Sequence, residues 1–502
     1  MQRWGSGWTA SKVAVLLIGA MFLSVESWYG DAWLVPWHDE VVIARLAQNW
    51  ATGRGFRNDL LEGVLAGAER RTYWQMPFYP MVLAVWGKLL GFDLNTLRWL
   101  SRLLGACSLL LTFALLKRLG ASPFGCVLAV LWVASDLNFQ FAANFVRPEM
   151  LCGTLLLLAA FLSLPSASLS SLTAQSQPFA LPCSPLVPFS SWWLLGVIAA
   201  LAVLTHPIAL PMALVLMAIA HRRSGWQGAI AIAVPLLLAM AGWLLYAVTD
   251  WATFLAQMQA HWLHKGRRTL EDFLTLALGA AFWGFRFYLG IPLNVVPAIA
   301  IVVTATAATL RRHLLLPKSF LAFAVALYTV AALGREASYP ALCVPVVYAL
   351  AALLWQRMSE QKVAWRKMLI AMALGWWAYQ GSVVARHLAA VPKIREELTT
   401  FYADLDRTLP PNARLLVGSF SPDPTIHLLR FRPDVRVYEL MPLPMVDRKA
   451  FRRLRHHLTH TLLLSGLRWR GGVRLRQWHF SFGGLAKGEK GITLVLWQCR
   501  AP

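Results

Sequence analysis

Two adjacent carboxylates, Asp39 and Glu40, are the first residues along the chain whose types and spacing could do chemistry. They follow an apolar run at 13–25 and precede a segment, 41–50, with helical apolar spacing. Such a pair could deprotonate an acceptor hydroxyl or bind a cation. It could equally serve the helix, with Asp39 as its cap and Glu40 at its positive end. The residues alone leave both interpretations open, and a capping aspartate can also be catalytic.

A second group of ionisable side chains lies in turns between later apolar stretches. Glu149 follows Arg147 and Pro148, which is also the pattern of a helix start near headgroups. His206 stands before a proline and could be an ordinary polar turn residue. The cluster at 261–268 could be a solvated face, or its arginines could clamp a phosphate or pyrophosphate. Each pattern therefore has a structural and a functional interpretation.

The composition indicates the kind of chain that must position these groups. Of its 502 residues, 58% are apolar and only 14% are charged, whereas soluble domains average roughly 45–50% and 25%. This excludes disordered, collagen-like and disulfide-scaffold classes and makes a purely soluble enzyme a poor fit. The net charge of +23 fits cytoplasmic loops and anionic lipid headgroups, so we expect membrane lipids and no nucleic acid as partners.

The apolar stretches predict a polytopic membrane protein with about eleven spans. Basic pairs such as Lys117-Arg118 and Arg222-Arg223 follow the helices that should run inward, as the positive-inside rule requires. We therefore expect a cytoplasmic N-terminus in the plasma (inner) membrane and the acidic turns on the extracytoplasmic face, where their convergence predicts a site. The expected spans are 13–25, 94–116, 123–142, 149–164, 191–205, 207–220, 227–247, 289–310, 318–334, 338–355 and 368–386, with 272–290 as an interfacial helix or a further span.

Two domains are expected, a membrane domain at 1–387 with a large first extracytoplasmic loop at 30–75, and a soluble extracytoplasmic domain at 388–502. The last 115 residues are rich in Lys and Arg (19, against 9 Asp and Glu). Short β-like runs and one basic helical segment predict a small α/β fold there. The strands are expected at Ala413–Phe420, Val435–Leu440 and Gly491–Gln498, and the helix at Val446–Leu464.

Several segments, in this order, resemble the GT-C glycosyltransferases, polytopic enzymes related to protein O-mannosyltransferases and aminoarabinose transferases. Asp39-Glu40 with the following helix and Gly53-Arg54-Gly55-Phe56 looks like the start of these enzymes. The further similar segments are Trp74–Pro80, Leu97–Gly105, Val146–Glu149, Leu204–Pro207 and Tyr339-Pro340 with Pro345. Gln75 and Met76 depart from the family, which has a lysine and a proline there, so a phosphate contact by that lysine must come from elsewhere or the donor differs.

The resemblance implies an inverting transfer of a sugar from a polyprenyl-phosphate donor to a hydroxyl of an acceptor glycan, lipid or protein outside the membrane. It makes Asp39 the general base, supported by Glu40, while Glu149 positions the acceptor or a cation. Candidates for the donor phosphate are Arg147, His206, Arg267, Arg268 and Arg335.

No cofactor is required by this chemistry, because the departing phosphate is already an anion. A divalent ion or zinc is an option, with Asp39, Glu149 and His206 as its ligands. The alternative function is a transporter or flippase of a lipid-linked sugar, and a third is an inactive scaffold. Transporters place coupling charges near the midplane and often show repeats, neither of which is clear here.

Overall fold

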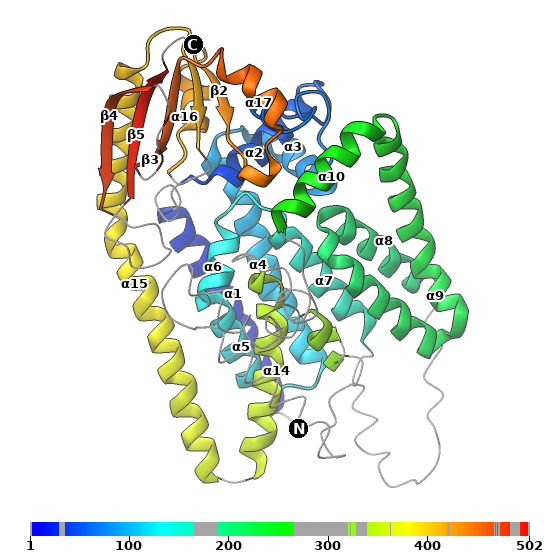
Figure 1. Ribbon diagram of the computed structural model, residues 1–502. Coiled ribbons are helices and arrows are strands. Elements are labelled where there is room, and N and C mark those ends of the chain that lie inside the picture. Colours follow the sequence, from blue (N-terminus) through cyan, green and yellow to red (C-terminus); the bar gives the residue numbers. More distant parts are fainter. Residues whose placement is uncertain are drawn as a thin grey trace.

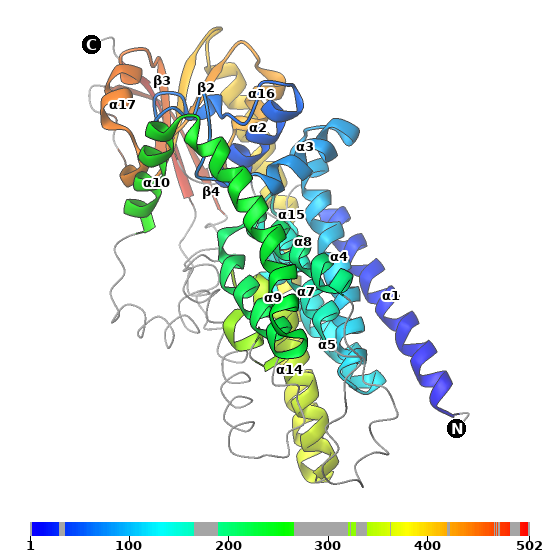
Figure 2. The same ribbon diagram turned by 90° about the vertical axis from the view of Figure 1, so that its right-hand side faces the viewer.

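The computed structural model (Figure 1) describes residues 3–29, 36–164, 189–265, 320–321, 323–327, 339–361, 363–418, 422–465, 467, 469, 472–481 and 492–499. Within these ranges most helices form an elongated bundle, and a small sheet lies at one end of it (Figures 1 and 2). Helix α1 (Arg3–Tyr29) begins at the other end. The remaining bundle helices are α4 (Leu94–Arg118), α5 (Pro123–Ser135), α6 (Leu137–Ala143), α7 (Glu149–Ser163), α8 (Phe189–Thr205), α9 (Leu210–Val248), α14 (Pro340–Gln361) and α15 (Val363–Thr408).

The length and apolar composition of the helices explain why they pack together as a bundle. Two helical stretches in the described ranges, Leu94–Arg118 and Pro207–Val248, are long and apolar enough to cross a membrane, judged by length and composition. Shorter apolar helices include α5, α7 and α8. Their facing sides form the largest apolar core, in which α8 packs on α9 and α4 on α7. The predicted spans 272–290 and 289–310 lie outside the described residues, as does most of 318–334.

Two predicted helices differ from the structure for local reasons. The predicted span 123–142 is two helices, because the Asp136 side chain accepts the backbone N–H groups of Asn138 and Phe139 and begins α6 there. Conversely, 207–220 and 227–247 merge into α9 after the short 3₁₀ turn η4 (Pro207–Ala209). Ser224 and Gly225 break its helical backbone, with φ of +61° at Gly225. The predicted separation between these two segments is therefore a kink.

The C-terminal part is a five-stranded sheet with helices beside it. The strand order is β2-β1-β3-β5-β4, in which β1 is parallel to β2 and β3, while β5 is antiparallel to β3 and β4. The elements are β1 (Arg414–Val417), α16 (Thr425–Phe431), β2 (Arg436–Glu439), η5 (Leu443–Met445), α17 (Arg448–Arg455), β3 (His460–Leu464), β4 (Gly472–Phe480) and β5 (Ile492–Cys499).

The three predicted strands correspond to β1, β2 and β5, but the predicted helix Val446–Leu464 is wrong in its second half. Only α17 is helical, and His460–Leu464 forms strand β3, where its apolar side chains are buried in the middle of the sheet. The predicted boundary at 387 falls inside α15, which continues without interruption from the bundle to the sheet (Figure 1).

The first loop and the sheet form one packed unit. Its elements are α2 (His38–Ala51), the 3₁₀ turn η1 (Asp59–Leu61), and α3 (Phe78–Leu90), with α10 (Trp251–Lys265) beside them. Val41 of α2 and Leu60 of η1 share an apolar core with Leu415, Val417 and Leu428 of the sheet domain. The N–H of Asp423 also donates to the Pro36 carbonyl (2.9 Å). The start of α2 is thus fixed against the C-terminal domain.

Candidate active site

The start of α2 holds two carboxylates in different environments. Helix α2 begins at His38 with Trp37 as its N-cap, so Asp39 is inside the first turn and does not cap the helix. The Glu40 side chain is fully buried and accepts the N–H groups of Trp37 (3.2 Å) and Val146 (3.0 Å). It also receives two hydrogen bonds from Arg98, at 2.9 and 2.6 Å. Glu40 therefore joins α2, α4 and the turn before α7.

Asp39 takes part in a second, more accessible cluster. Arg147 donates to Asp39 (2.6 Å) and contacts Glu149 (2.8 Å), so one guanidinium bridges two carboxylates. Its charge lies over the Trp37 ring, 5.6 Å from the centroid. The Asp39 side chain is 35% exposed, whereas that of Glu149 is 1% exposed. Asp39 is thus the member of this cluster that a substrate can reach.

Of the remaining predicted site residues, the structure describes only His206. His206 accepts the N–H of Ile208 (3.2 Å) through its side chain, and its ring lies edge-on to Tyr339 with centroids 5.1 Å apart. Arg267, Arg268 and Arg335 are outside the described residues.

The predicted metal ligands do not all lie close together. Asp39, Glu149 and His206 do not form a group whose ligand atoms all lie within 4.8 Å of one another. Within the part of the chain that the structure describes, one such group exists, formed by His38, Asp423 and Glu439.

The sequence did not point to this buried group or to Arg98. His38 was visible only as the neighbour of Asp39, and Asp423 and Glu439 come from a domain almost 400 residues away. Burial raises the pKa of Glu439 to about 8, and burial together with the Glu439 charge raises that of Asp423 well above its ordinary value. Carboxyl groups with such pKa values are frequent at functional sites.

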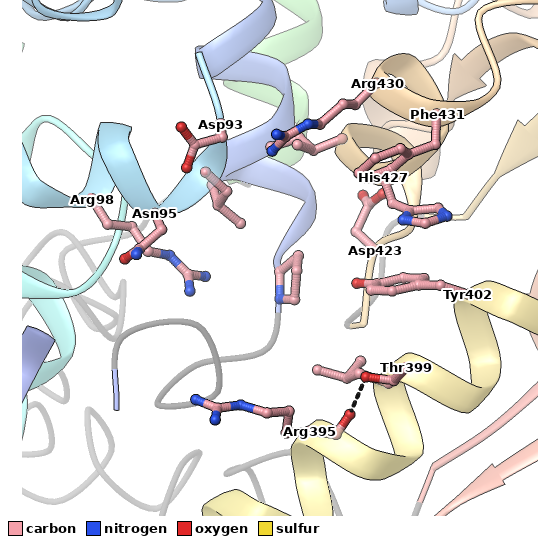
Figure 3. A pocket seen from close by; sticks show the side chains of 14 residues that line it. Asp93, Asn95, Arg98, Arg395, Thr399, Tyr402, Asp423, His427, Arg430 and Phe431 are labelled. Atoms are coloured by element: carbon pink, nitrogen blue, oxygen red, sulfur yellow. Dashed lines mark hydrogen bonds between the residues drawn. The ribbon is translucent and has the colours of Figure 1, made fainter. Parts of the chain in front are cut away.

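A cavity of about 470 Å³ opens between the starts of α2 and α4, the end of α15 and α16 (Figure 3). This volume is within the range of small-molecule sites. Arg98 lines it beside Glu40, and Arg395 and Arg430 have no ion pair among the described residues. The Tyr402 and His427 rings stack with centroids 4.5 Å apart. The cavity therefore combines three arginines, whose guanidinium groups suit phosphate or carboxylate, with the aromatic rings of Tyr402 and His427, and two aspartates, Asp93 and Asp423, also line it.

Across nearly its whole length the chain is similar in fold to solved GT-C glycosyltransferases. It is similar to the crystal structures of ArnT from Cupriavidus metallidurans. The apo structure gives a TM-score of 0.53 at 14% identity, over 97% of this chain and 98% of that one. The undecaprenyl-phosphate-bound structure gives 0.52 at 15%, over 96% and 97%. The apo Archaeoglobus fulgidus oligosaccharyltransferase gives 0.50 at 11%, over 91% and 69%. No family model and no curated protein matches the sequence.

Proposed function

We propose that the protein is an inverting glycosyltransferase that moves a sugar from a polyprenyl-phosphate donor to an acceptor hydroxyl at the extracytoplasmic membrane surface. The observation that carries this proposal is the Asp39–Arg147–Glu149 cluster at the sheet end of a GT-C fold, with Asp39 accessible. The bound undecaprenyl phosphate of one similar structure supports a lipid-phosphate donor.

In the proposed reaction Asp39 removes the proton of the acceptor hydroxyl as its oxygen attacks the anomeric carbon. The bond between that carbon and the phosphate oxygen breaks, and the polyprenyl phosphate leaves as an anion. Arg147 bridges Asp39 and the buried Glu149, so that Glu149 positions Asp39 through the shared guanidinium. Positioned bases contribute about 10²–10⁴-fold to such reactions. His206, Arg267, Arg268 and Arg335 remain our candidates for the departing phosphate.

The cavity supports an assignment for the acceptor. We place an anionic group of the acceptor beside Arg395 and Arg430, and a sugar ring on the Tyr402 and His427 stack. Arg98 lines this cavity and pairs with Glu40, which follows Asp39 in the sequence. We propose that the reacting end of the acceptor extends from the cavity towards Asp39, which does not itself line it.

The test is transfer of a radiolabelled sugar by the full chain in vesicles loaded with lipid-linked donor. The expected result is label in an acceptor, lost in Asp39→Asn and retained in Glu69→Gln, whose side chain makes only a weak surface pair with Arg70 (3.7 Å). Translocation of the donor across the vesicle without transfer would contradict the proposal and favour the transporter alternative. If the protein neither transfers nor translocates any of the donors, the result would favour the third alternative, an inactive scaffold.

A further inference from the structure

Three ionisable side chains from distant parts of the chain meet beneath the start of α2. His38 is the first residue of that helix, Asp423 lies in the turn before α16, and Glu439 ends β2. Their exposures are 2%, 1% and 0%. One potential ligand atom of each lies within 4.8 Å of the other two, and His38 Nδ1 is 2.9 Å from Glu439 Oε2. The group is therefore compact and closed to solvent.

The hydrogen bonds around this group leave one carboxylate oxygen without a donor. The Thr425 hydroxyl donates to Glu439, and the Thr425 N–H donates to Asp423 Oδ1 (2.9 Å). Asp423 Oδ2 is buried and has no hydrogen-bond partner. Among the described residues, His38 is the basic side chain paired with these acids. If both carboxyl groups were ionised, the group would carry an uncompensated negative charge, which is costly in a buried place. The raised pKa values of Asp423 and Glu439 express that cost, and a bound cation would remove it.

We propose that His38, Asp423 and Glu439 bind a divalent transition-metal ion, with Zn²⁺ as the first expectation. One imidazole nitrogen and two carboxylate oxygens are ordinary zinc ligands, and ligand atoms around a tetrahedral zinc are roughly 3.4 Å apart. The His38–Glu439 separation is 2.9 Å and the other two are at most 4.8 Å, so the ligand atoms reach that arrangement with shifts of no more than about 1.4 Å. The ion removes the charge imbalance and gives Asp423 Oδ2 a partner.

The ion would join the first loop to the C-terminal domain immediately before Asp39. His38 and Asp39 are consecutive residues of α2, so a metal held by His38 fixes the backbone that carries the proposed base. The site is distinct from Asp39, Glu149 and His206, and its existence does not depend on the proposed function. Its role is positional, because the three ligands are at most 2% exposed and, of the three, only Asp423 lines the cavity assigned to the acceptor.

The test is the metal content of the full chain purified in detergent, measured by mass spectrometry after growth with zinc or with manganese. We expect about one ion per chain in the natural protein, and a loss of about tenfold or more in His38→Gln, Asp423→Asn and Glu439→Gln. The matched controls are His479→Gln and Asp434→Asn, which alter an exposed histidine paired with Thr493 and an exposed acid paired with Arg432, and which should keep the ion.

Less than about a tenth of an ion per chain in the natural protein under both growth conditions would overturn the proposal, as would an ion unaffected by all three variants. The first result would mean that Asp423 and Glu439 share a proton instead. If the variants do not fold, the natural protein is loaded with cobalt instead, and its absorption spectrum tests the proposed site. An absorption spectrum of nitrogen and oxygen coordination, abolished by excess zinc, supports the site, and its absence refutes it.

Discussion

Replacing Asp39 and Glu40 one at a time should separate catalysis from stability, although the two residues are adjacent. In Asp39→Asn the amide oxygen can still accept from Arg147, whose charge remains paired with Glu149. Asp39 is 35% exposed, so we expect a stability cost below about 1 kcal/mol. Removal of a general base should nevertheless lower turnover by about 10²-fold or more.

Glu40→Gln should have the opposite profile. Its carboxylate accepts four hydrogen bonds in a fully buried place, and Arg98, which supplies two of them, is 1% exposed. Removing one charge of a buried pair costs about 3–5 kcal/mol. With an unfolding entropy of about 1 kcal/mol/K for a chain of 502 residues, this lowers the melting temperature by roughly 3–5 °C.

The assay measures turnover at saturating donor and, on the same preparation, the temperature at which the protein loses its monodisperse chromatographic peak. Glu69→Gln is the control for both measurements. Near-normal turnover of Asp39→Asn, with transfer abolished in Glu149→Gln, would move the base to Glu149. An unchanged melting temperature for Glu40→Gln would refute the argument that Glu40 holds the three segments together.

Two further predictions concern the first loop. Burial of Asp59 is outweighed by its hydrogen bonds from Arg45 and Asn49, which lower its pKa to about 2. This pair therefore stabilises the folded state above pH 4, by about 1 kcal/mol after allowing for exposure, and the contribution disappears as the pH falls towards 2. Melting curves of Asp59→Asn should lack that part of the acid dependence, and an identical acid profile would contradict the assignment. Gly67 has a φ of +62°, and a Cβ there would lie 2.7 Å from Thr253 Cγ2. Gly67→Ala should cost about 1–3 kcal/mol of stability, whereas Gly19→Ala, with open space around it, should not lower the melting temperature.

The bundle helices could be predicted because each contains a mostly apolar run, which is long enough to cross a membrane in α4 and shorter in α7. The failures occurred where one side chain, or pairing with a segment distant in the sequence, decides the local structure. Asp136 divides an apolar run by capping a helix, which hydropathy does not register. At His460–Leu464 the apolar residues continue the pattern of α17, and only the neighbouring strands β1 and β5 make this segment extended.

The residues of the candidate site also fall into two groups, those that could be predicted from the sequence and those that could not. Asp39, Arg147 and Glu149 were predicted from turns of recognisable type, and the structure brings them together. The partners of His38 could not be predicted, because no local pattern links a residue to Asp423 and Glu439 in another domain. Arg98 was part of a predicted helix but gave no sign that it would face Glu40.

The continuity of α15 has a mechanical consequence for the cavity. Its 46 residues correspond to about 70 Å of helix, and Tyr402, which lines the cavity, lies ten residues beyond Pro392. A bend of about 10° at that proline would displace the Tyr402 backbone by roughly 2.6 Å, given a rise of about 1.5 Å per residue. A change in the tilt of the half of α15 before Pro392 would therefore move Tyr402 and change the width of the proposed acceptor cavity.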